Sequence, residues 1–109
     1  MAVTSVAHGH EECVVDQLET LDTQTVAGVY VLVVDLGNMV NGDITVLSIF
    51  TKCLHDSSSK LAFEAIYAHV QSEPLKYSPP IPVDVEIICT LMQTDGTARH
   101  YDWSLLKVG

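Results

Sequence analysis

The densest group of reactive side chains lies near the N-terminus, in the run His8-Gly9-His10-Glu11-Glu12-Cys13. Imidazole, carboxylate and thiolate are the ligands that zinc and copper accept in proteins. No second group with ligand spacing, such as H-x-x-x-H, completes the set elsewhere in the sequence. We therefore expect this run to belong to a polar N-terminal arm that binds no metal.

Nucleophilic catalysis needs a Ser or Cys beside a His and an acid, and the chain contains such parts without a motif that assembles them. The candidate triad residues are Asp35, His55, His69, His100 and Asp102, together with three cysteines. The sequence has no G-x-S-x-G elbow, no G-x-G-x-x-G loop and no Walker pattern. The sequence therefore predicts that the protein is not an enzyme and needs no cofactor.

Two further groups lie on predicted strands. Asp84 and Glu86 would share one strand face, where paired carboxylates can do acid and base work, but a solvated outer face opposite the apolar one explains both without chemistry and is the favoured interpretation. The stretch 99–103 holds the only Arg and the only Trp of the chain. Tyr101, Trp103 and Leu105 would share a face, which predicts core or interface and leaves a sugar-stacking platform as the alternative.

The three cysteines are far apart in the sequence and form no C-x-x-C pair. Cys53 and Cys89 each lie in an apolar, strand-like run. Together with Cys13, they are expected to be buried free thiols that behave as small hydrophobic residues.

Period-two patterning dominates the elements that must position these side chains. Residues 83–92 alternate between apolar and other residues, and the Asp95-Gly96 pair that follows suits a tight turn, so a C-terminal hairpin with residues 98–108 is expected. Residues 29–36 and 43–54 are apolar on both faces, which predicts central strands covered on both sides. The Asn41-Gly42 turn between them predicts that they are antiparallel neighbours.

Residues 60–71 fit two periods. Phe63, Ile66, Tyr67 and Val70 have helical spacing, whereas alternate residues from Leu61 onward line one face of a strand. The surrounding hairpins favour the strand, and four prolines in residues 74–82 favour an extended crossover. Five or six short strands with regular turns predict an all-β fold, a small antiparallel β-sandwich of about six strands with an N-terminal arm.

Composition excludes several classes of function. The 109 residues are enough for one domain, and 5 Lys and Arg against 14 Asp and Glu give a net charge of −9. A polyanionic partner would be repelled, so no nucleic-acid binding is expected. The longest apolar run is too short for a membrane span, and the first residues lack the pattern of a secretory signal, so no membrane association is expected.

The order of elements resembles small structural proteins of tailed bacteriophages, the capsid cement or decoration proteins. The likeness extends from Gly28 to Val108. It rests on residues 28–36, Asn38-Met39, Gly42-Asp43, the strand to Leu54, Leu61-Ala62-Phe63, Tyr67-Ala68-His69 and Lys76-Tyr77-Ser78-Pro79-Pro80. The resemblance implies a β-sandwich that is made in the host cytoplasm, binds the outer face of an icosahedral shell in the virion and reinforces it.

The expected partners are therefore the major capsid protein and further copies of the chain on the shell. Residues 1–12 are expected to form the arm, and residues 13–109 a single β-sandwich domain. The predicted shell contacts come from the arm, the proline-rich crossover and a cationic segment: His8, His10, Tyr77, Pro79, Pro80, Ile81 and Arg99. The alternatives are a ligand-binding sandwich for carbohydrate binding or adhesion, and a small enzyme in which residues 60–71 form a helix.

Overall fold

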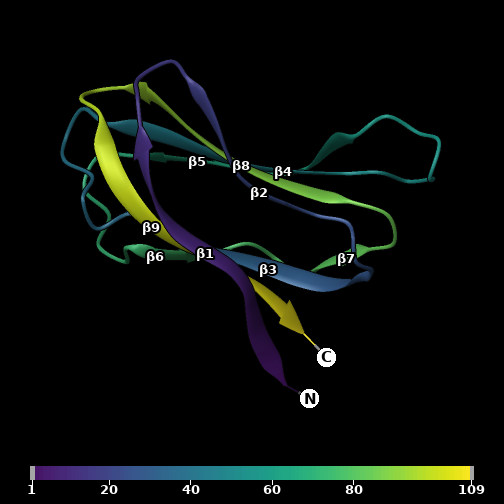
Figure 1. Cartoon of the computed structure of the whole chain (residues 1–109). Helices are drawn as coiled ribbons and strands as arrows, with labels where there is room; N and C mark the ends of the chain where they lie inside the picture. The colour runs from purple at the N-terminus through teal and green to yellow at the C-terminus, as the bar shows by residue number, and fades with distance from the viewer. Residues whose placement is uncertain (1, 109) are drawn as a thin grey trace.

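The computed structural model describes residues 2–108, and these fold into two antiparallel sheets packed face to face (Figure 1). The first sheet has the order β1-β9-β3, with β6 and β7 on the free edge of β3, and the second has the order β2-β8-β4-β5. The strands are β1 (Val3–Cys13), β2 (Leu18–Gln24), β3 (Gly28–Asp35), β4 (Ile44–Thr51), β5 (Lys60–Ala68), β6 (Leu75–Tyr77), β7 (Ile81–Val83), β8 (Ile87–Asp95) and β9 (Arg99–Val108).

The strands pair in the order of a folded-over hairpin, with the first strand next to the last. β1 pairs with β9, β2 with β8, β3 with β6 and β7, and β4 with β5, so the chain is one long hairpin whose tip is the β4–β5 loop. Successive pairs alternate between the two sheets, and the β3–β9 and β4–β8 ladders close each sheet. This arrangement is a jelly roll.

The prediction of an all-β sandwich is confirmed, and residues 60–68 are a strand as expected. The count of about six strands is wrong, because residues 2–108 form nine. Two of the additional strands, β6 and β7, come from the proline-rich crossover. They have three residues each and pair with the edge of β3, where a Pro that cannot donate a hydrogen bond is tolerated.

The expected N-terminal arm is a strand of the first sheet. Residues 3–13 pair with β9 along their length, with a bulge near Val6. Ala7, Gly9, Glu11 and Cys13 lie on the side of the strand that faces the second sheet, while the side chains of His8, His10 and Glu12 point outward. The polar residues hid this alternation, because an edge strand with one solvated face needs few apolar side chains.

Both predicted hairpins are wrong. β8 and β9 belong to different sheets, as do β3 and β4, so their connections are arches from one sheet to the other. Gly42 and Gly96 do have positive φ, 101° and 95°. A turn sequence specifies this backbone conformation but not whether the next strand pairs with the previous one or crosses to the opposite sheet.

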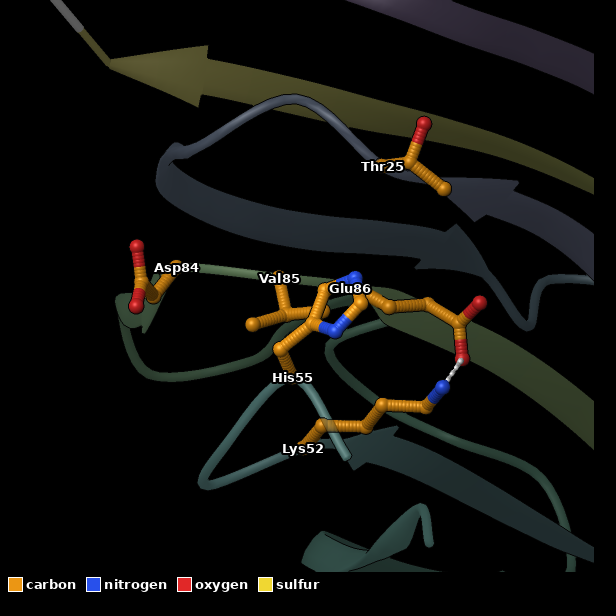
Figure 2. A pocket seen from close by; sticks show the side chains of 6 residues that line it. All are labelled: Thr25, Lys52, His55, Asp84, Val85 and Glu86. Carbon is orange, nitrogen blue, oxygen red and sulfur yellow. Dashed lines mark ion pairs between the residues drawn. The ribbon is translucent and has the colours of Figure 1, made fainter. Parts of the chain in front are cut away.

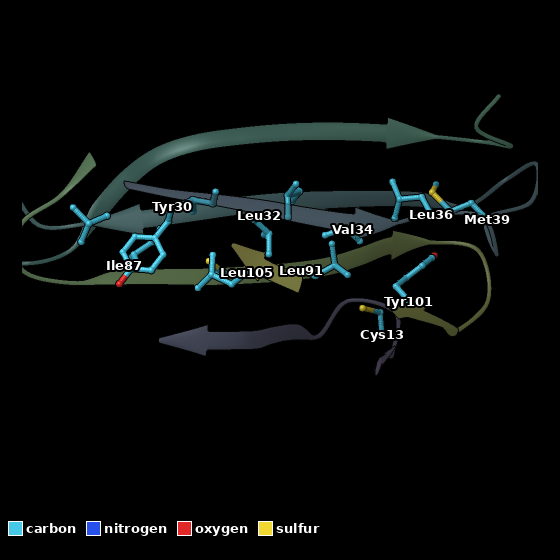
Figure 3. Close-up of a cluster of buried hydrophobic side chains, with 14 residues drawn as sticks. Cys13, Tyr30, Leu32, Val34, Leu36, Met39, Ile87, Leu91, Tyr101 and Leu105 are labelled. Carbon is cyan, nitrogen blue, oxygen red and sulfur yellow. The ribbon is translucent and has the colours of Figure 1, made fainter. Parts of the chain in front are cut away.

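The core fills the space between the two sheets (Figure 3). Its largest side chains include Tyr30, Leu32, Ile49, Leu91 and Leu105, each 1% exposed or less. The aromatic stripe of β9 points inward, with Tyr101 and Leu105 buried and Trp103 packed against the cluster. The stripe therefore belongs to the core and is not an exposed sugar-stacking platform.

The expectation for the cysteines is confirmed for two of three. Cys13 and Cys89 are fully buried, whereas Cys53 lies in the exposed β4–β5 loop because β4 ends at Thr51. Burial, reinforced by Glu19 and Glu11 near Cys13 and by Asp22 near Cys89, raises the pKa of both buried thiols to about 12. Thiolate is the reactive form, so the buried pair should be inert at neutral pH.

We therefore expect a maleimide to modify one thiol per native chain at pH 7.5 and three in denaturant. Cys53→Ser should abolish the native reaction. Electrospray mass spectrometry counts the adducts directly. Rapid labelling of Cys13 or Cys89 in the native protein would contradict their burial.

Candidate interaction surfaces

The outer face of the first sheet brings together three of the predicted contact residues. Here it is called the histidine face, and the strand register arranges it in rows that cross the sheet. One row runs His8, Ser104, Val33 and Tyr77, and the next runs His10, Asp102, Asp35 and Leu75. Residues 8 and 77 come from opposite edges of the sheet, and neither charge nor sequence spacing indicated that they share a face.

A ladder of imidazoles and carboxylates lies at one end of the histidine face. The His10 Nδ1 atom is 2.5 Å from Asp102 Oδ1, and His100 Nε2 is 3.2 Å from Glu12 Oε2. The two imidazole rings stack with their centroids 4.8 Å apart. All four side chains are about half exposed or more, so the pairs are solvent-screened and contribute little to stability.

The same residues do not assemble the metal cluster that the sequence raised as a possibility. His8 and His10 point outward, whereas Cys13 points into the core, because residues an odd number of positions apart lie on opposite faces of a strand. Within residues 2–108, no three His, Cys, Asp or Glu side chains are close enough to hold a metal ion.

A shallow depression of about 230 Å³ opens on the histidine face. Its lining residues are Val33, Asp35, Leu75, Asp102, Trp103 and Ser104. Asp35 and Asp102 are direct cross-strand partners, so two carboxylates lie side by side above an apolar floor. A surface of this kind can receive a protruding side chain of a protein partner.

The proline-rich segment forms the free edge of the first sheet. Ser78 is buried, its amide donates to the Leu32 carbonyl at 2.8 Å, and its hydroxyl accepts from the Leu32 amide at 3.0 Å. Pro79 and Pro80 follow and are exposed, and Ile81 begins β7. Because proline has no amide hydrogen, this edge cannot readily accept another strand.

Arg99 lies apart from the other predicted contacts. Its Nε donates to Asp43 Oδ2 at 3.0 Å, and the Asp43 side chain is 1% exposed. The pair fixes the β3–β4 arch to the start of β9. Arg99 is therefore engaged within the chain, and a charge reversal there would disturb the fold as well as any contact.

A second depression, of about 580 Å³, lies at the opposite end of the sandwich from Arg99 (Figure 2). Its lining residues come from three loops: Thr25, Lys52, His55, Asp84, Val85 and Glu86. The Glu86 carboxylate lies 3.9 Å from Lys52 Nζ and accepts from the Ser59 hydroxyl at 3.1 Å. Asp84 and Glu86 thus lie on the crossover between β7 and β8. The expectation that they share one face of a strand is wrong.

The triad parts are dispersed in the same way. His55 lies in the β4–β5 loop, whereas His69 follows β5 at the other end of that strand. His100 and Asp102 are on the histidine face. No hydrogen bond within residues 2–108 joins a Ser or Cys side chain to any of these histidines.

The outer face of the second sheet, here called the apolar face, contradicts the expectation that its strands are covered on both sides. Leu18, Leu61 and Ile66 are at least half exposed on the two edge strands. Between them lie the half-buried side chains of Val46, Phe50, Ile88 and Met92, and the small residues Ser48 and Thr90. The apolar pattern of residues 43–54 did predict the hydrophobic outer face but not that it would be left uncovered.

Residues 2–108 contain no helix that could cross a membrane. Comparison of the chain with protein-family models, with curated proteins and with solved structures gives no match.

Proposed function

We propose that the protein is a structural subunit of a tailed-bacteriophage virion, a cement subunit that binds the outer surface of the icosahedral shell through its histidine face. The support is the jelly-roll strand order, which recurs in viral capsid domains and in lectins. This is an analogy of fold, and a fold hosts many functions, so the proposal needs a test at the surface itself.

The histidine face supplies chemistry suited to a protein partner. It combines the exposed aromatic ring of Tyr77, the apolar side chains of Val33 and Leu75, and the imidazole and carboxylate groups of β1 and β9. Apolar patches with a polar rim are typical of protein interfaces. Repetition over the shell lets many weak contacts of this kind act together. The net charge of −9 suits an outer surface rather than one facing the genome.

Point substitutions are a better test than removal of residues 1–12, because that removal would delete most of β1 and expose one side of β9. Tyr77→Glu and His8→Glu change exposed side chains on one row of the histidine face. Val26→Glu, an exposed position in the β2–β3 turn, is the matched control.

Virions assembled without this protein, from a phage whose gene for it is deleted, should bind the purified protein when it is added. We expect the double variant Tyr77→Glu/His8→Glu to bind at least tenfold more weakly, and Val26→Glu to bind as the parent does. Gel densitometry of sedimented particles measures occupancy. Absence of the chain from purified virions, or failure of the parent protein to rebind, would overturn the proposal.

A further inference from the structure

The apolar face differs sharply from the rest of the molecule in charge. The chain has 14 acidic residues. On the apolar face, however, Glu64 is the only charged side chain among those that point outward from the four strands between the row of Leu18 and the row of Thr23. Its carboxylate accepts from the Ser48 hydroxyl at 3.4 Å. An exposed, largely apolar surface that is almost free of charge is a candidate interaction site.

The strand register arranges the apolar face in three rows. The first row is Leu18, Met92, Val46 and Ile66; the second is Thr20, Thr90, Ser48 and Glu64; the third is Thr23, Ile88, Phe50 and Leu61. In the middle row Thr90 and Ser48 are buried beneath their larger neighbours, so polar atoms are exposed only at its two ends, Thr20 and Glu64.

We propose that a second copy of this chain covers the apolar face and that the two copies are related by a two-fold axis parallel to the strands. With such an axis, the strand at one edge of the first copy faces the strand at the other edge of the second copy. Each row of the first copy lies opposite the same row of the second copy. Ile66 of one copy then meets Leu18 of the other, and both are among the most exposed apolar side chains of the chain. The Glu64 carboxylate meets the Thr20 hydroxyl, which can donate a hydrogen bond to it.

The charge on Glu64 selects this axis over the other simple choice. A two-fold axis perpendicular to the strands would place each strand on its own copy, with Glu64 opposite Glu64 at the edge of the interface. Like charges brought together in a partly desolvated interface oppose association strongly. Both axes keep the strands of the two sheets aligned, as in ordinary sheet-on-sheet packing, so the charge on Glu64 is what separates them.

The area of the face sets the strength of the association. Four strands about 4.8 Å apart, over about five residues of 3.4 Å, give a projected area of roughly 330 Å² per copy. A standard stable interface buries about 800 Å² per partner. An interface below this size is typical of a weak, transient association, so the dimer should form only at high protein concentration. Two copies of charge −9 also repel each other, so added salt should strengthen the dimer by screening.

Sedimentation equilibrium of the purified full chain between 10 μM and 1 mM tests the proposal without any phage component, so its outcome is independent of the proposed function. We expect a monomer–dimer equilibrium that tightens between 0.05 and 0.5 M NaCl. Ile66→Glu should raise the dissociation constant at least tenfold, and Thr20→Glu should do the same by facing Glu64. Val70 is exposed but lies outside the apolar face, so Val70→Glu should leave the dissociation constant unchanged.

A charge pair tests the axis itself. Leu18 and Ile66 lie on opposite edge strands of one copy, so the double variant Leu18→Lys/Ile66→Glu can pair these charges only between copies. We expect it to dimerise at least tenfold more tightly than Ile66→Glu alone. No recovery would overturn the proposed axis. A parent chain that stays monomeric at 1 mM, or a dimer indifferent to Ile66→Glu, would overturn the second copy as occupant.

Discussion

Ile87→Ala is expected to lower the free energy of unfolding by about 2–5 kcal/mol, because it removes buried methyl groups and leaves a cavity that the two sheets cannot fully close. Ile87 is the first residue of β8, is 0% exposed and belongs to the same buried cluster as Tyr30 (Figure 3). Its main-chain partners in the second sheet are Gln24 and Thr51. Urea unfolding followed by tryptophan fluorescence measures the change.

Ile88 provides a matched control one residue away. It points to the apolar face, where it is half-buried, so Ile88→Ala removes the same atoms with less loss of burial and no enclosed cavity. We expect its cost to be less than half that of Ile87→Ala. Equal costs for the two substitutions would mean that the assigned faces of β8 are wrong.

The elements that sequence reasoning placed correctly are those whose pattern is dictated by burial. β3 alternates between fully buried and half-buried side chains, and β5 was identified as a strand against a competing helical period. In both cases the side chains facing the core recur at every second position, which is a local property of the chain. β1 was missed as a strand because its inward positions include Gly9 and Glu11, which carry no hydrophobic signal.

Pairing could not be predicted from the same patterns. The ladder partners of β1 lie more than 85 residues away in β9, and nothing in either segment encodes the other. The crossover of residues 84–86 is a further example, since the alternation in 83–92 continues through it although β7 and β8 lie in different sheets. Which strand crosses to the opposite sheet is decided by packing between sheets, a long-range property.

For the candidate surfaces too, the residue types could be identified from the sequence but their arrangement in space could not. The individual residues of the histidine face were identified from their types, but their assembly on one face depends on β9 and β3 lying between β1 and β6. Arg99 was assigned to the same surface because residues 99–107 hold two of the few cations of the chain. The structure pairs it instead with Asp43, a residue that carried no sequence signal beyond its place after Gly42.

Asp43 joins the two arches at one end of the sandwich. Its Oδ2 accepts from the Val40 amide and from Arg99 Nε, both at 3.0 Å, and its Oδ1 accepts from the Thr97 amide at 3.3 Å. Gly96 packs so closely that a Cβ there would lie 1.9 Å from Asp43 Oδ1. The β3–β4 and β8–β9 connections are therefore held together through one carboxylate.

We expect Asp43→Ala to destabilise the fold by about 2–4 kcal/mol, because it removes a buried carboxylate, leaves the partly buried amides of Val40 and Thr97 without this acceptor, and leaves the partly buried Arg99 guanidinium without its partner. Asp43→Asn keeps one side-chain oxygen as an acceptor and should cost less. Asp102→Ala, which breaks the exposed pair with His10, should cost less than about 1 kcal/mol. Urea unfolding at pH 7 compares the three variants. Similar costs for Asp43→Ala and Asp102→Ala would show that the Asp43 contacts do not hold the arches.

The effect of Asp43 should also depend on pH. Burial alone would raise the pKa of this carboxyl, but the hydrogen bonds from Val40, Arg99 and Thr97 outweigh it and hold the pKa below the ordinary value of 3.8. The unfolded chain then binds the proton more readily than the folded one, so the stabilisation is fully present above about pH 4. It is lost as the pH falls through the lowered folded pKa. The stability difference between the parent and Asp43→Ala should therefore be constant from pH 5 to 7 and shrink below pH 4, and a difference that grows on acidification would show that the folded pKa is raised instead.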